Sequence, residues 1–389
     1  SSEAVVRVDF PNYQTVSVNV NGVTMSRLQM GNAFPVLSAG APEMLESAIS
    51  LIVPENSRPT AEIIDADYQT IDNFNLAPSK GKLYRNIDPN TVPYQKNSLY
   101  TQNRYLYNDS IEIGNPYQLR DYNGIAVKFF PFAYNPVQKS LKAYKSITAV
   151  IHFNSNRTIK QLSKVSKTFD IIYSDHFLNY KQVKANPLVE AGNILILAPA
   201  NFCEAMQPYA DWKIKNGYPT EIVSLATVGN TSTAVKNYIS SYYTNHGLTF
   251  VIIVGDNGQF PVISAGGNVS DNYYTEILGS DNYPDLILGK ISAETVAQVN
   301  TQVTRFIQYE ENPGAGTHFP VFCGIGSDQG PGDNNEYDYQ HIRNIDNVLT
   351  GYTYTSGFEF FEGNQGGLDA SGSPTASQIG AAVNSGVGV

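Results

Sequence analysis

Apolar and polar residues alternate with a period of two in the first 165 residues. The alternation is plainest over residues 5–10, 14–20, 126–129 and 149–153. Successive side chains of a strand point to opposite faces, so this pattern predicts strands with one buried face. Asn21-Gly22 and Asn123-Gly124 are typical of tight hairpin turns. We therefore expect an antiparallel β domain, either a sandwich or a barrel.

From residue 193 the pattern changes to short apolar runs that alternate with helical periodicity. Buried strands are predicted over 194–198, 221–225, 250–254, 286–291, 321–325 and 358–361. Helices are predicted over about 205–215, 232–243, 293–311, 336–349 and 377–385, the fourth with Ile342, Ile345 and Val348 on one face. This order predicts a mostly parallel sheet with helices on both faces. Because another apolar strand starts at 387–389, we expect an α/β domain that is incomplete at its C-terminal end.

The change of pattern divides the chain into three segments. We expect a β-rich domain over 1–180, an exposed linker over 181–192, and the first part of an α/β domain over 193–389. Residues 181–187 are polar and have no helical pattern, and their basic residues are Lys181 and Lys184. Exposed polar linkers are preferred sites of proteolysis, so a cut between about Tyr180 and Val189 is predicted.

Composition narrows the classes of function. A net charge of −10 with only 15% charged residues argues against a nucleic-acid partner, whose phosphates need a basic surface. Abundant neutral polar residues and few lysines suit an exported protein. No apolar run approaches the roughly 18 residues of a membrane helix. Cys203 and Cys323 are far apart in apolar surroundings, which favours free thiols over a disulfide.

Two acids flank a predicted loop at the carboxyl end of the strand 321–325. Asp328 opens a stretch rich in glycine, proline and Asx residues, and Asp338 lies where the next helix starts. Ligands of open α/β sheets bind at such ends of strands. The alternative is a pair of solvated loop acids, with Asp338 as a favourable charge at a helix N-terminus. For each acid taken singly this alternative is favoured, and the rest of the chain decides between the two interpretations.

Other candidate residues carry weaker signals. Cys323 falls inside a predicted strand and Cys203 just before a helix, so packing roles are favoured for both. The five histidines show no catalytic or metal-binding spacing. Acidic loops contain Asp256, Asp271, Asp281 and Asp285, and carboxylate oxygens are ligands that Ca²⁺ prefers. A structural calcium site that includes Asp256 and Asp281 is one interpretation, and solvated turns, favoured by the lack of an EF-hand series, are the other.

Short sequence motifs occur along both predicted domains. Those in the β domain are Leu76-Ala77-Pro78-Ser79-Lys80-Gly81, Asp88-Pro89, Leu119-Arg120-Asp121, Tyr134-Asn135-Pro136-Val137 and Phe169-Asp170-Ile171-Ile172-Tyr173. Those in the α/β domain are Asp211-Trp212-Lys213, Val254-Gly255-Asp256 and Ser327-Asp328-Gln329-Gly330-Pro331. In these motifs and their shared order, which spans nearly the whole chain, the sequence resembles the gingipain family of secreted cysteine endopeptidases, in particular zymogens of its arginine-specific members.

The resemblance implies a caspase-like catalytic domain preceded by an inhibitory prodomain. It aligns Asp328 with the acid that orients the catalytic histidine, and Asp338 with the carboxylate of the primary specificity pocket. It places Arg85 of the prodomain in that pocket as a mimic of a substrate arginine. Residues 387–389 resemble the opening of the family's histidine strand, so the catalytic histidine and cysteine are expected beyond Val389, on a further segment or a second chain.

The leading hypothesis is therefore the zymogen of a bacterial cysteine endopeptidase that cleaves after arginine. It is expected to be exported through the periplasm to the cell surface or medium, to act on proteins or peptides, and to be inhibited by its own prodomain. No catalytic cofactor is expected. The alternative is a non-catalytic relative that works as a surface or secretion-associated binding protein. Absence of the downstream histidine and cysteine would favour that alternative.

Overall fold

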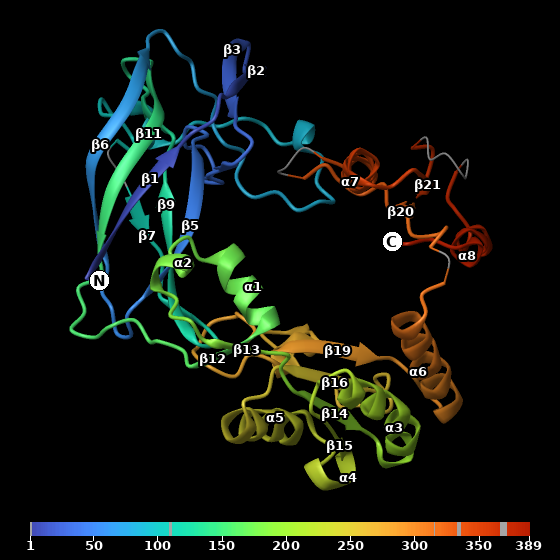
Figure 1. Cartoon of the computed structure of the whole chain (residues 1–389). Coiled ribbons are helices and arrows are strands. Elements are labelled where there is room, and N and C mark those ends of the chain that lie inside the picture. The colour runs from blue at the N-terminus through green and yellow to red at the C-terminus, as the bar shows by residue number, and fades with distance from the viewer. Residues whose placement is uncertain (1, 109–110, 315, 333–335, 366–371) are drawn as a thin grey trace.

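The computed structural model describes residues 2–108, 111–314, 316–332, 336–365 and 372–389. Figure 1 shows a β part, blue to green, an α/β part below it in green, yellow and orange, and a smaller C-terminal group of elements in orange and red. No helix in the described ranges is long and apolar enough to cross a membrane.

The β part contains two antiparallel sheets and a separate hairpin. The first sheet joins β1 (Glu3–Asp9), β6 (Thr60–Ile71) and β10 (Phe132–Asn135) to β11 (Ser140–His152). The second contains β4 (Phe34–Pro35), β5 (Leu45–Val53), β7 (Ile111–Ile113), β8 (Tyr117–Leu119) and β9 (Tyr122–Phe129). β2 (Gln14–Val20) and β3 (Val23–Gln29) form the hairpin. The antiparallel pairing follows from the alternation with a period of two.

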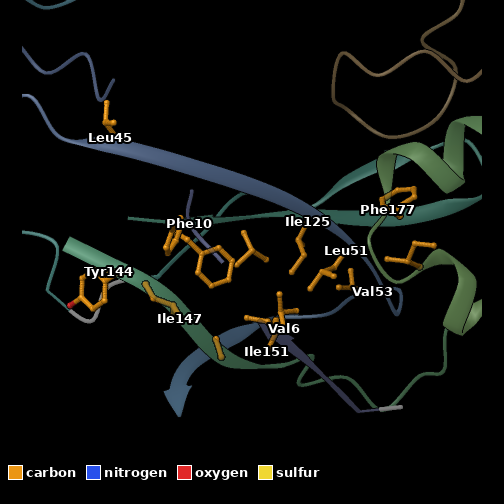
Figure 2. Close-up of a cluster of buried hydrophobic side chains, with 14 of the residues drawn as sticks. Val6, Phe10, Leu45, Leu51, Val53, Ile125, Tyr144, Ile147, Ile151 and Phe177 are labelled. Atoms are coloured by element: carbon orange, nitrogen blue, oxygen red, sulfur yellow. The ribbon is translucent and has the colours of Figure 1, made fainter. Parts of the chain in front are cut away.

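One apolar core joins the two sheets. Val6, Ile147 and Ile151 of the first sheet pack into the same cluster as Leu51 and Ile125 of the second. Figure 2 shows these side chains between the two layers of strands. Each strand contributes its apolar face, so the period-two pattern and the buried core have the same physical origin.

A short helical segment follows the sheets and departs from the prediction. It contains β12 (Lys164–Ser166), α1 (Lys167–His176), α2 (Tyr180–Val183) and β13 (Leu188–Glu190). Residues 181–187 were expected to be free of helix, and α2 shows that this was wrong. A four-residue helix is too short to show a period in the sequence. It is stabilised by tertiary contacts, because Tyr180 is buried and its hydroxyl donates to Asp170 Oδ1 at 2.6 Å.

The α/β part has a parallel sheet in the order β15-β14-β16-β19. Its strands are β14 (Ile194–Ala198), β15 (Thr220–Ser224), β16 (Phe250–Val254) and β19 (Ile287–Ile291). Its helices are α3 (Ala200–Lys215), α4 (Leu225–Val228), α5 (Ser232–His246) and α6 (Val296–Glu311). Ile194 and Ile196 pack in the cluster with α3 and α6, whereas Leu195 and Leu197 pack in the cluster with α5. Helices therefore cover both faces, as predicted.

The remaining strands and helices are short or C-terminal. The short elements are β17 (Ser264–Ala265), β18 (Asn268–Val269) and the 3-10 turns η1 (Pro89–Thr91), η2 (Ser98–Thr101) and η3 (Asp271–Tyr274). The C-terminal elements are β20 (Val321–Gly326), α7 (Asp338–Tyr352), β21 (Ser356–Phe361) and α8 (Ala376–Ser385).

Strand β20 was expected to continue the larger sheet, but in the described residues it pairs with β21 in a separate parallel sheet. The predicted strand at 387–389 lies beside β20, because Cys323 N donates to Val389 O and Gly388 N donates to Val321 O. Helix α7 also differs from expectation. Its buried residue is Asp346, while Val348 is 70% exposed.

Candidate functional site

Asp338 is held at the first residue of α7 by the loop that follows β20. Ser327 Oγ donates to Asp338 Oδ2 at 2.6 Å, and Asp338 N donates to Gln329 O at 2.9 Å. The first N–H groups of a helix favour a negative charge at this end. Because Ser327 engages one carboxylate oxygen, the other is left for a different donor. This geometry suits the binding of a cation at the carboxyl end of a strand.

That donor is Arg85 from the β part. Its Nη2 lies 2.5 Å from Asp338 Oδ1 and donates to Glu336 O at 2.9 Å. The side chains are 40% and 35% exposed, so the pair lies at a partly solvated rim. A Cβ added to Gly332, whose φ is +53°, would lie 3.2 Å from Arg85 Cα. Arg85 lies on the segment between β6 and β7, here called the arm, which runs from the β part toward α7 (Figure 1). A residue larger than glycine at position 332 would therefore crowd the arm.

The other predicted site residues lie apart from this ion pair. Asp328 N lies 3.5 Å from Glu362 Oε2, at the loop that follows β21. Lys184 Nζ lies 2.5 Å from Asp170 Oδ1, and Lys181 is exposed. The structure thus brings Arg85 and Asp338 together, whereas the roles predicted for Asp328, Lys181 and Lys184 stay predictions.

The acids proposed for calcium are engaged by backbone groups. Asp281 Oδ2 accepts from Gln118 N at 2.8 Å and Oδ1 from Tyr283 N at 2.9 Å. Asp256 Oδ1 accepts from Asn257 N at 2.8 Å. Within the described ranges, no three His, Cys, Asp or Glu residues form a group suited to a metal ion. These contacts satisfy Asp281 without a cation, so its donor set does not favour calcium, and calcium binding stays an untested prediction.

Both cysteines lie in structural surroundings. Cys323 packs in a small apolar cluster with Phe358, Phe360 and Ala382. Cys203, in the first turn of α3, directs Sγ toward Pro199 O at 3.5 Å. These environments agree with the packing roles predicted for the two thiols.

The structure also reveals titratable groups that the sequence did not single out. Asp346 faces β20, and burial together with nearby Glu359 raises the pKa of its carboxyl to about 6. Asp285 was taken as part of a solvated turn, yet it is completely buried. It accepts hydrogen bonds from three backbone N–H groups, of Arg120, Ile277 and Leu278. Neither acid was singled out by a sequence pattern, because its burial depends on how the loop before β19, or α7 and β20, pack.

Two family models match the chain in succession. The propeptide of family C25 matches residues 2–186, and peptidase family C25 matches residues 188–389. The second match covers more than half of the chain. The chain therefore belongs to peptidase family C25, and it combines a gingipain-like prodomain with part of the catalytic domain.

Curated relatives come from Porphyromonas gingivalis. Gingipain R1 is 31% identical over 81% of this chain and 33% of the relative, and gingipain R2 is 30% identical over 81% of this chain and 45% of the relative. A Lys-gingipain is 23% identical over 78% of this chain and 19% of the relative. The chain thus spans between about a fifth and a half of the length of these relatives.

Solved structures of the same family also match. A complex of the pro- and mature domains of RgpB from Porphyromonas gingivalis has 25% identity and a TM-score of 0.42, with 46% of this chain and 93% of that chain covered. The Arg-specific cysteine proteinase gingipain R has 28% identity and a TM-score of 0.44, with 50% and 45% covered.

Proposed function

We propose that this chain is the propeptide and the first part of the catalytic domain of a cysteine endopeptidase zymogen that cleaves after arginine. The contact of Arg85 with Asp338 carries the proposal. A carboxylate at the carboxyl end of a strand, oriented by Ser327, suits the recognition of a guanidinium through charge-assisted hydrogen bonds. An arginine of the propeptide already fills this position, as an inhibitor that mimics a substrate would. The catalytic part is proposed to be caspase-like, and the two sheets of the propeptide to form a sandwich.

The remaining roles complete the proposal. Asp328 is proposed to orient the catalytic histidine, and this histidine and the nucleophilic cysteine are proposed to lie on residues after Val389. The packing of Cys323 among Phe358, Phe360 and Ala382, and the contact of Cys203 Sγ with Pro199 O, support this assignment because both are typical of structural cysteines. The protein is proposed to be exported to the cell surface or medium and to cleave proteins or peptides.

Asp338→Asn tests the specificity in the protein that includes the residues following Val389. We expect kcat/KM for arginyl peptides to fall by roughly 10- to 150-fold, because the guanidinium loses a charged acceptor worth about 1.5–3 kcal/mol. Activity on a peptide with a neutral residue at that position should change little. The measurement is a comparison of kcat/KM on matched fluorogenic peptides, with Glu311→Gln, an exposed acid at the end of α6 in the catalytic part, as control.

Equal losses on arginyl and neutral peptides would contradict the assignment of Asp338 to specificity. A different result would favour a non-catalytic binding relative instead. In that case the natural sequence after Val389 would have other residues in place of the catalytic histidine or cysteine, and the wild-type protein would cleave none of the peptides.

The junction between the two matched regions is proposed as the activation site. Residues 184–187 have no regular secondary structure and separate α2 from β13. Lys184 is restrained by Asp170 at 2.5 Å, and β13 pairs with β12. A protease must therefore open this segment before it can cut at Lys184.

Asp170→Asn is expected to speed cleavage after Lys184 by a lysine-specific protease by roughly 5- to 30-fold, since an ion-paired hydrogen bond of about 1–2 kcal/mol no longer holds Lys184. The rate is measured on the full chain by gel densitometry and the new N-terminus by sequencing. Asp175→Asn, on the same helix, is the control. A mature N-terminus outside residues 181–190 would contradict the proposed junction.

A further inference from the structure

Arg120 connects the β part to the α/β part at a place different from Arg85. It lies at the turn between β8 and β9, and its side chain is only 10% exposed. Nη1 donates to Leu248 O at 2.7 Å and to Asp285 O at 2.8 Å, both in the α/β part. Its guanidinium is therefore inserted into a site built from the loop after α5 and the loop before β19.

Aromatic rings enclose the same guanidinium. Its carbon lies 4.6 Å from the centre of the Phe169 ring and 5.1 Å from that of Tyr243. Phe169 belongs to α1 and Tyr243 to α5, so the cation lies between the two parts of the chain. Cation–π contacts strengthen when the cation is removed from water, as it is here. Nε also lies 3.5 Å from Asp121 Oδ2, which supplies a negative charge.

Asp285 of the α/β part completes the site that binds Arg120. The residue is completely buried, and its Oδ1 accepts from Arg120 N at 2.8 Å while Oδ2 accepts from Ile277 and Leu278. One of its three donors thus comes from the β part. If the β part leaves, a buried carboxylate loses this donor and the neighbouring guanidinium together, which is unfavourable.

The backbone of Arg120 is strained, which fits a binding role for its side chain. Its φ is +49°, in the left-handed region that disfavours a residue with a Cβ. Among the described residues, seven other than glycine have a positive φ, and four of these are asparagine. Asparagine fits this conformation more easily than arginine. A strained residue whose side chain fills a built site points to a binding role.

Neighbouring contacts extend the same interface. Gln118 N donates to Asp281 Oδ2, and the ring of Tyr117 stacks on that of Tyr283 with centres 4.2 Å apart. Tyr283 and Ile287 of the α/β part also pack against the core of the β part. The β8–β9 turn is therefore anchored over several residues, whereas Arg85 touches its partner at a partly solvated rim.

We propose that Leu248, Asp285 and Tyr243 form a second guanidinium-binding site, separate from Asp338, through which Arg120 holds the cleaved propeptide on the catalytic part independently of Arg85. The ligand class is an arginine side chain presented by a tight turn. This inference rests on the proposed zymogen function in treating the β part as a separable propeptide. It makes retention of the propeptide and blockage of the specificity pocket two separate functions.

The test compares wild type and variants by the rate at which the propeptide dissociates after the chain has been cut at the junction. A recognition sequence for a site-specific protease is inserted between Asn186 and Pro187 of the full chain, the protein is cut, and the release rate of the labelled propeptide is measured after dilution. Arg120→Asn removes the guanidinium and keeps a residue that suits the left-handed turn. Lys139→Asn is the matched control, because Lys139 is exposed in the propeptide and has a φ of +50°.

Arg120→Asn should speed release by roughly 30-fold or more, as expected for the loss of two hydrogen bonds from a largely buried, charged guanidinium to Leu248 O and Asp285 O. Lys139→Asn should leave the rate unchanged, and Arg120→Asn should speed release by a similar factor when Arg85→Ala is already present, because the two arginines are proposed to bind independently. An increase below tenfold for Arg120→Asn, or the loss of its effect in the Arg85→Ala background, overturns the proposal.

Hydrogen exchange on the uncut chain provides an independent measurement if the variant releases its propeptide during purification. The amides of Ile277 and Leu278, bound to Asp285, should exchange faster in Arg120→Asn than in Lys139→Asn. Unchanged protection of both amides overturns the proposal. Neither readout needs peptidase activity, so a failure of the proposed arginine specificity would leave these results unaffected and the two failures can be told apart.

Discussion

Replacing Arg85 with alanine is expected to weaken inhibition of the catalytic domain by its propeptide by roughly 10- to 150-fold. Arg85 Nη2 contacts both Asp338 Oδ1 and Glu336 O, and a hydrogen bond to a charged group contributes about 1.5–3 kcal/mol. Full burial of the pair would give a larger loss, but side chains that are 40% and 35% exposed keep part of their hydration. The measurement is the inhibition constant of added propeptide against the mature enzyme.

Lys82→Ala is the matched control, since Lys82 is an exposed basic residue of the same arm. Its inhibition constant should stay within about twofold of the wild type. A double-mutant cycle with Asp338→Asn then isolates the pair, because the effect of Arg85→Ala should shrink once Asp338 has lost its charge. Equal inhibition by the Arg85→Ala and wild-type propeptides would refute the idea that Arg85 blocks the specificity pocket.

Replacing Tyr173 with alanine is expected to destabilise the β part by about 3–5 kcal/mol, a loss typical of removing a buried aromatic ring. Tyr173 is fully buried in α1, and its ring contacts those of Phe169, Tyr122 and Tyr180. Its hydroxyl donates to Asp121 Oδ2 at 2.8 Å. The cavity left by alanine would remove these contacts and leave Asp121 without this donor. Urea unfolding followed by circular dichroism measures the loss.

Tyr173→Phe separates packing from hydrogen bonding. It keeps the ring and should cost only about 1–2 kcal/mol for the lost hydroxyl. Tyr352→Ala, at an 81% exposed position, should change stability by less than about 0.5 kcal/mol. A loss for Tyr173→Ala no larger than that for Tyr173→Phe would mean that the aromatic cluster contributes little to stability.

Regular elements with strong periodicity were predictable from the sequence. Residues 194–198 and 250–254 match β14 and β16, and the change from strands to alternating strands and helices at residue 193 falls where the α/β part begins. These features depend on side chains within a few residues of one another, so the pattern contains them. The short helix α2 was missed because it is held by Tyr180 and Asp170, not by a pattern of its own.

The candidate site could be predicted only in part from the sequence. Local signals placed Asp328 and Asp338 at a strand end, but favoured solvated loop acids when each was taken singly. The family resemblance singled out Arg85. Only the tertiary structure brings Arg85 against Asp338, buries Asp285, and inserts Arg120 between Phe169 and Tyr243.

The physical reason is the same for each of these contacts. Secondary structure follows from backbone geometry and the local alternation of apolar residues, which the sequence by itself determines. The ion pair, the buried carboxylate and the inserted guanidinium join segments from different parts of the chain. Only the packing of the two domains decides which charged groups are desolvated and which form ion pairs or hydrogen bonds.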